Sequence, residues 1–323
     1  MEILNINILI CTFSFLTFII FYKFSFLIGK KTALLDKNQV PLLGGIFLYI
    51  GYLLNYFFGY DLLTEREFIV DIYFISSIFL LALLDDRFDL NAYLRIILLS
   101  IVIIFFIYKN NLFIYSLNSK YFGFFYFSNN IFIKFLFPTF CIFVLLNAFN
   151  FTDGINCLAS LIGISWFLYL IIKVPIILNI YLILILFIIA FSILNFVNKS
   201  YLGDSGNYII STIIGVLILI LNTKFPYIFY IEEILLLLLM PGIDLIRLFY
   251  VRIKNGKSPL NGDLNHLHHL LVEKFGLIKS LIVYGLLINV PIYLYYFFNS
   301  LLIYLIIFSI FTYTLLIRKI SKI

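Results

Sequence analysis

Stretches of about 20 apolar residues recur from one end of this 323-residue chain to the other. Each is long enough to cross a hydrocarbon core of ~30 Å as a helix. The stretches are continuously apolar rather than alternating, which excludes a transmembrane barrel. Only 12% of the residues are charged, against about 25% in a water-soluble domain. The sequence therefore predicts an all-α, polytopic integral membrane protein.

Eleven spans are expected. No soluble domain or repeat array interrupts them, so residues 1–323 are interpreted as one membrane-embedded domain. The first span is too long for the apolar core of a secretory signal. The ninth is the least regular, because Pro241-Gly242 falls inside it and proline breaks helices. The spans are 3–22, 42–58, 67–84, 92–108, 131–149, 155–172, 175–195, 206–222, 228–250, 277–298 and 300–317.

The basic residues indicate how the chain is inserted. With the N-terminus outside, 16 of the 22 lysine and arginine residues fall in inner segments, the bias typical of cytoplasmic loops. The net charge of +6 therefore reflects topology, and no nucleic-acid partner is expected. Under the same topology all of the polar motifs face the cytoplasm, whereas the outer loops are plain.

The first polar motif is LDDRFD at 84–89, in which Asp85 and Asp86 end an apolar span. Carboxylates at this depth are costly unless they are paired or bind a metal. Oxygen ligands suit Mg²⁺, and adjacent like charges raise one pKa, which can make a base. A solvated helix end is the alternative for the pair, and a cap of the next helix is the alternative for Asp89.

The second motif is NAFNFTDGIN at 147–156. Asn147, Asn150 and Asp153 recur at every third position, so on a helix they would share one face. Such side chains can hydrogen-bond a nucleobase and a ribose, and Asp153 can also bind a metal. Hydrogen bonding between helices is the alternative.

The third motif is YLGDSGN at 201–207, which sets Asp204 between two glycines at the mouth of a span. Glycines let a phosphate or a metal approach the backbone, and the N-terminus of the following helix favours anions. The alternative is that Asp204 only caps that helix.

All three histidines of the chain lie within four positions, in NHLHH at 265–269. Clustered imidazoles bind metals, or bind phosphate when protonated. No cysteine is close in the sequence, so pyrophosphate binding by His266, His268 and His269 is favoured over a structural zinc site. A weaker motif is KNQVPLLGG at 37–45, where Lys37 is a movable phosphate ligand and the glycine pair allows close backbone contact.

Together the motifs supply carboxylates for Mg²⁺, an Asn/Asp face for a nucleoside, and Lys and His for phosphates. Phosphoryl transfer runs mainly on charge neutralisation and positioning. The residues therefore indicate an enzyme that transfers a phosphoryl group from a soluble nucleotide donor to a lipid acceptor.

In order, spacing and sidedness, from about Lys31 to Leu271, the motifs resemble the polyprenyl-phosphate N-acetylhexosamine-1-phosphate transferase family. The resemblance implies a UDP-N-acetylhexosamine donor, undecaprenyl phosphate as acceptor, and UMP as leaving product. It implies Mg²⁺ as cofactor, with Mn²⁺ as an alternative, and the first step of cell-wall or lipopolysaccharide glycan synthesis. The enzyme would act at the cytoplasmic face of a bacterial inner membrane, and a homodimer is a further expectation.

The motifs and the resemblance together assign roles to individual residues. Asp204 and Asp86 are the metal candidates, and Asp85 is the candidate base for the lipid phosphate. The further catalytic candidates are Asp86, Asp153, His266 and His268, and the substrate-binding candidates are Lys37, Asn147, Asn150, Asn195 and His269.

Two departures from the family pattern concern the donor side. Asn156 stands where many members carry a second aspartate, and Asp36 stands near an expected histidine. Asn156 is the one support for an alternative, an inactive relative that serves as a partner in a glycan-assembly complex. A transporter is another alternative, but it predicts ionisable residues near the midplane and inverted repeats, which the sequence lacks. A CDP-alcohol phosphatidyltransferase would need an Asp-Gly-Ala-Arg cluster, which is also missing.

Overall fold

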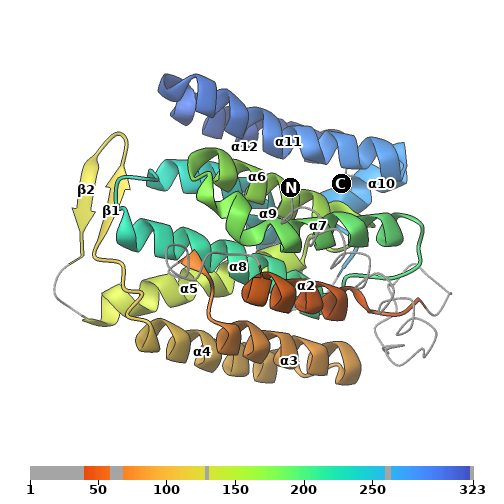
Figure 1. Cartoon of the computed structure of the whole chain (residues 1–323). Coiled ribbons are helices and arrows are strands. Elements are labelled where there is room, and N and C mark those ends of the chain that lie inside the picture. Colours follow the sequence, from red (N-terminus) through yellow and green to blue (C-terminus); the bar gives the residue numbers. More distant parts are fainter. Residues whose placement is uncertain (1–39, 59–67, 128–130, 259–262, 321–323) are drawn as a thin grey trace, which may run out of the picture.

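The computed structural model describes residues 40–58, 68–127, 131–258 and 263–320. Within these ranges the chain is mostly helical, and its long helices run side by side in one bundle (Figure 1). The elements are α2 Gly44–Phe58, α3 Ile72–Phe88, α4 Ala92–Lys109, β1 Ser116–Ser119, β2 Gly123–Tyr126, α5 Ile131–Asn150, α6 Leu158–Lys173, α7 Ile176–Phe196, α8 Gly203–Lys224, α9 Ile231–Lys254, α10 Leu267–Phe275, α11 Leu277–Phe297, a 3₁₀ turn Asn299–Leu301, and α12 Leu302–Ile320.

Seven of the described helices are long and apolar enough to cross a membrane, as expected of a multi-pass membrane protein. Each expected span from 42–58 onward corresponds to one helix, although α2, α3 and α6 are only 15, 17 and 16 residues long. Span 3–22 lies outside the described residues, and so does Lys37. The count of eleven spans therefore stays a prediction.

The break expected at Pro241 is wrong, because α9 continues unbroken from Ile231 to Lys254. Proline cannot donate to the carbonyl four residues earlier, which here belongs to Leu237. The indole Nε1 of Trp166 donates to that carbonyl at 3.0 Å instead. A side chain from α6 thus satisfies the group that the proline leaves unpaired, and the helix needs no interruption.

Helix α8 forms the centre of the bundle and packs against α2, α3, α5 and α6. In its apolar 18-residue stretch 94% of the residues are buried inside the protein. The outer helices expose apolar side chains instead, for example Ile101 of α4 and Phe308 of α12. Most of α8 is therefore surrounded by other helices of the protein.

Two small elements were not expected. Strands β1 and β2 form an antiparallel hairpin, with Ser116 opposite Tyr126, in a loop that the sequence left plain. The short helix α10 follows α9 and contacts α11 and α12. The hairpin lies at one end of the bundle and α10 at the opposite end (Figure 1). Below, this second end is called the α10 end.

Candidate active site

A cleft of about 360 Å³ lies at the α10 end, where polar segments from distant parts of the chain meet. Asp86 comes from the last turn of α3, Asp153 from the turn after α5, and Asp204 from the first turn of α8. Three of the sequence motifs therefore share one cavity. The other lining residues are Leu42, Gly154, Ile155, Asn156, Asn195, Asn198, Tyr201, Gly203, Val272 and Leu277.

Asp86 holds the beginning of α8. Its Oδ1 accepts a hydrogen bond from the backbone N–H of Asp204 at 2.8 Å, and its Oδ2 accepts from the N–H of Ser205 at 3.0 Å and from the Ser205 hydroxyl at 2.6 Å. The first N–H groups of a helix lack partners within it, so a carboxylate satisfies them and matches the helix dipole. Gly203 has a φ of 74°, and a Cβ there would lie 2.9 Å from Asp86 Oδ2. Glycine is required at this approach.

Asp85 contacts Arg95 and is not among the residues that line the cleft. Its Oδ2 accepts a hydrogen bond from Arg95 Nη1 at 2.7 Å, and its Oδ1 accepts from the N–H of Leu90 at 2.9 Å. Arg95 Nη1 also lies 3.3 Å from Asp204 Oδ2. Arg95 thus connects the first and third motifs, and the base role of Asp85 stays a prediction.

Arg95 belongs to none of the sequence motifs and is one of the 16 basic residues counted above as inner. A signal was present, because a cation in the first turn of a helix opposes the helix dipole and needs a compensating partner. The alternative role of Asp89, as a cap of the next helix, is wrong. Asp89 ends α3 in the left-handed region at φ 52°, whereas Asn91 caps α4 by accepting from the N–H of Tyr93.

Asn207 joins the second and third motifs. Its Nδ2 lies 2.8 Å from Asp153 Oδ2, 3.1 Å from Asn150 Oδ1 and 2.9 Å from the carbonyl of Gly203. Helix α5 ends at Asn150, so Asp153 lies in the following turn rather than on a continued helical face. Burial raises the pKa of Asp153 to about 8, and the nearby carboxylates of Asp204 and Asp86 act in the same direction.

The remaining asparagines take different positions. Asn147 donates to the carbonyl of Phe143 at 2.8 Å, one turn back on its own helix. Asn195 lines the cleft but is buried, accepting from the N–H of Cys157 at 2.5 Å and donating to the carbonyl of Ser200 at 2.9 Å. It therefore fixes two loops that border the cleft. Asn156 donates to Asn198 Oδ1 at 2.6 Å, and both side chains line the cleft.

The histidines lie at the start of α10 and pack against the turn that carries Asp153. A Cβ at Gly154 would come within 2.1 Å of His268 Nε2 and 2.6 Å of His269 Nε2, so glycine permits this contact. Burial lowers the pKa of His268 well below its usual value and that of His269 to about 4. Neutral rings near pH 7 can still donate a hydrogen bond to a phosphate oxygen.

The segment that begins at Pro41 pairs with the loop before α8. The N–H of Tyr201 donates to the carbonyl of Pro41 at 3.0 Å, and the N–H of Gly44 donates to the carbonyl of Tyr201 at 3.1 Å. A Cβ at Gly45 would lie 1.9 Å from Ser205 Oγ. The close backbone contact expected of the glycine pair is confirmed.

The donor set at the cleft fits a hard divalent cation. Asp86, Asp153 and Asp204 supply carboxylate oxygens, which Mg²⁺ prefers. Burial raises the pKa of Asp153, and the negative charge of Asp204 and Asp86, which a cation would offset, acts in the same direction. Both oxygens of Asp86 already accept hydrogen bonds from the start of α8. The side chain of Asp204 is 16% exposed, so its carboxylate is the more accessible of the two metal candidates.

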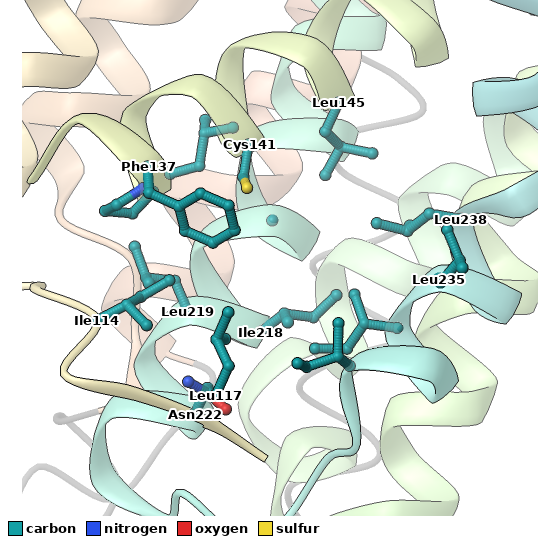
Figure 2. Close-up of a pocket in the computed structure, with 15 residues that line it drawn as sticks. Ile114, Leu117, Phe137, Cys141, Leu145, Ile218, Leu219, Asn222, Leu235 and Leu238 are labelled. Atoms are coloured by element: carbon teal, nitrogen blue, oxygen red, sulfur yellow. The ribbon is translucent and has the colours of Figure 1, made fainter. Parts of the chain in front are cut away.

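A second, apolar cavity of about 290 Å³ lies farther along the bundle, between α5, α8 and α9 (Figure 2). Phe137, Leu145 and Leu235 line it, and Leu235 is 50% exposed. Gly215, also in the lining, is 11 residues beyond Asp204 on α8, which corresponds to roughly 16 Å of helix. An aliphatic chain would therefore find an apolar groove at this distance from the polar cleft.

Residues 68–222 match the model of glycosyl transferase family 4. The family resemblance is confirmed. The segment of the chain that matches the family model contains Asp85, Asp153 and Asp204, whereas the three histidines lie after it.

Similar proteins carry the name undecaprenyl-phosphate alpha-N-acetylglucosaminyl 1-phosphate transferase. One from Escherichia coli O157:H7 is 29% identical over 299 residues, covering 82% of this chain and 76% of the relative. One from Thermotoga maritima is 26% identical over 277 residues, covering 79% and 78%. One from Haemophilus influenzae is 28% identical over 263 residues, covering 73% and 69%. The likeness thus extends well beyond the segment that matches the family model.

Proposed function

We propose that this protein transfers an N-acetylhexosamine 1-phosphate from a UDP-linked sugar to undecaprenyl phosphate and releases UMP. The reaction would start the synthesis of a cell-surface glycan on the cytoplasmic face of a bacterial inner membrane. The observation that carries the proposal is the meeting of Asp86, Asp153 and Asp204 in one cleft at the α10 end. The names of the relatives support the acceptor and the transferred group.

The two cavities match the two substrates. The polar cleft has carboxylates and amides for a nucleotide and its cation, whereas the groove between α5, α8 and α9 is lined almost entirely by apolar side chains. A polyprenyl chain can lie along that groove with its phosphate at the cleft. Because a polyprenyl chain is long and flexible, it can span the roughly 16 Å between Gly215 and Asp204 along α8.

In the proposed reaction an oxygen of the lipid phosphate attacks the sugar-side phosphorus, and the bond to the UMP oxygen breaks. Bound Mg²⁺ would neutralise charge on the pyrophosphate, with Asp204 as its main protein ligand and Asp153 and Asp86 beside it. Asp85 is retained as the candidate base for the lipid phosphate, and His266, His268 and His269 would hold the departing phosphate. Lys37, Asn147, Asn150 and Asn195 are retained as candidate donor-side groups.

The decisive experiment offers the purified protein undecaprenyl phosphate, Mg²⁺ and a panel of UDP-N-acetylhexosamines, with mass spectrometry of UMP and lipid-linked sugar. UMP release with one donor, lost on chelation and restored by Mg²⁺ or Mn²⁺, is the expected result. No product from folded protein with any donor would contradict the proposal and favour an inactive assembly partner. The Asn156→Asp variant would then test whether the missing aspartate is responsible. The relatives reported above are named as transferases, which gives no support to a transporter.

A further inference from the structure

Behind the histidines lies a buried polar network that the sequence motifs did not include. Asp244 is on α9 within an apolar span, and it is only 4% exposed. Its Oδ2 lies 3.0 Å from His266 Nδ1. Its Oδ1 accepts a hydrogen bond from Tyr313 O–H at 2.5 Å and from Arg247 Nη2 at 2.9 Å. Asp244 therefore connects α9, the start of α10 and α12.

The network also fixes the backbone that carries His266. Arg247 Nη2 donates to the carbonyl of Asn265 at 2.5 Å, and Arg247 Nε donates to Tyr313 Oη at 2.7 Å. The N–H of Leu267 is 3.4 Å from both oxygens of Asp244. Buried ionised groups are expensive unless all of their hydrogen bonds are made. Asp244 and Arg247 make these hydrogen bonds, and the bonds fix the position of His266 relative to α9 and α12.

We infer that Asp244 is a positioning residue for His266: it holds the ring in the tautomer with hydrogen on Nδ1 and so presents Nε2 to a phosphate of the donor. The identity of that phosphate rests on the proposed function. A carboxylate that pairs with a guanidinium has no proton to give, so the contact at 3.0 Å requires the hydrogen on Nδ1. In that tautomer Nε2 accepts a proton or, once protonated, donates a hydrogen bond to the departing phosphate.

The position of the ring supports the same role. His266 stacks on His268 with 5.1 Å between ring centroids, and it lies 5.8 Å from Phe151, in the turn that carries Asp153. Rotation of the ring would break the Asp244 contact and disturb both of these packing partners. Asp244 can therefore set the direction of Nε2 without itself touching the substrate.

A competing use of the same side chains is a metal site, because donor atoms of Asp244, His266 and His268 all lie within 4.8 Å of one another. However, Asp244 already accepts from Arg247 and Tyr313, and a guanidinium beside a cation is unfavourable. The two uses differ in an observable way. A metal bound to Nδ1 of His266 would displace the hydrogen from that nitrogen, whereas the inferred contact with Asp244 keeps it there.

The test uses the full-length protein in lipid nanodiscs with ¹⁵N-labelled histidine. The chain has only three histidines, so long-range imidazole spectra resolve each ring. We expect His266 of the wild type to carry hydrogen on Nδ1. In Asp244→Asn the amide can donate to Nδ1, which should move the hydrogen to Nε2. Asp263→Asn is the matched control, since Asp263 pairs with Arg252 at 2.8 Å and no hydrogen bond joins it to a histidine. It should leave the His266 tautomer unchanged.

Kinetics on the same preparations give the second readout. Asp244→Asn should lower kcat by ~10² to 10⁴ while KM for the UDP-sugar changes less than about threefold, as expected when a general acid–base ring takes the wrong tautomer. A wild-type ring with hydrogen on Nε2, a metal bound to Nδ1 of His266, or a tautomer change with full activity would overturn the inference. If the wild type transfers no sugar, the proposed function fails, whereas the wild-type spectrum still decides whether Asp244 orients His266.

Discussion

The carboxylate of Asp86 accepts a hydrogen bond from the backbone N–H of Asp204 at 2.8 Å, although the two residues are 118 positions apart. This bond, with those from Ser205, joins the C-terminal end of α3 to the N-terminal end of α8. The backbone of Asp204 is thereby fixed where its side chain lines the cleft. The Asp204 and Gly203 variants both test this connection between α3 and α8.

Replacing Asp204 by Asn tests the main metal ligand. The amide keeps the size of the side chain but removes the charge, so UMP release should fall by at least ~10³, the scale seen when an electrostatic group that acts on the transition state is lost. Asp89→Asn is the control, because Asp89 is exposed and asparagine tolerates its left-handed backbone. An active Asp204→Asn enzyme would contradict the metal assignment.

Gly203→Ala tests the approach of Asp86 to α8. An alanine at φ 74° should cost about 1–2 kcal/mol in backbone strain, and its Cβ would also meet Asp86 Oδ2 at 2.9 Å. Gly256→Ala has the same sign of φ, at 67°, but nothing lies within 4 Å of its Cβ. We expect thermal unfolding of the purified protein to shift clearly further for Gly203→Ala than for Gly256→Ala. Equal shifts would show that the Asp86 contact adds nothing.

Leu235→Trp tests the apolar groove. A larger ring at this lining position should compete with the polyprenyl chain, so KM for undecaprenyl phosphate should rise by about tenfold while KM for the UDP-sugar stays unchanged. Ile246→Trp adds the same bulk to an exposed position of the same helix outside the groove and is the matched control. If both variants behave alike, the lipid lies elsewhere.

Proton uptake on donor binding tests the histidine segment. His269 has a pKa of about 4, so at pH 6 its ring is neutral in the free protein. A bound pyrophosphate would raise that pKa toward the ordinary value of about 6.5, and binding should then take up as much as ~0.7 proton. Titration calorimetry with UDP-N-acetylglucosamine, without lipid acceptor and in buffers of different ionisation enthalpy, measures this uptake. His269→Asn should abolish it, and uptake that persists in the variant would assign it to another group.

The local pattern of the sequence predicted most of the fold. Apolar runs located the long helices from α2 onward but not the short α10, and the motifs located Asp86, Asp153 and Asp204, which the structure brings to one cleft. The unbroken α9 was missed because the partner of the Leu237 carbonyl, Trp166, is 71 residues away. From the neighbouring sequence alone, a proline within a helix predicts a break in that helix.

The supporting residues of the site were missed for a related reason. Asp244 lies three residues before Arg247 in an apolar span and 22 residues before His266, and Arg95 pairs with Asp204 across 109 residues. Such pairs are created by helix packing, and a single sequence does not display them. A charge within a membrane span is still informative, because it must find a partner. The sequence predicted where the reactive groups gather, and the structure adds the residues that hold them.

The central position of α8 has a consequence for how a substrate enters. One wall of the cleft is built from α3 and α8, which backbone hydrogen bonds to Asp86 lock together inside the bundle. The opposite wall is carried by α10, which packs mainly on the peripheral helices α11 and α12. On this side the start of α10 is held to α9 and α12 by the buried network of Asp244. Any movement of α10 that widens the cleft must therefore break the contacts of Asp244 with His266 and Tyr313.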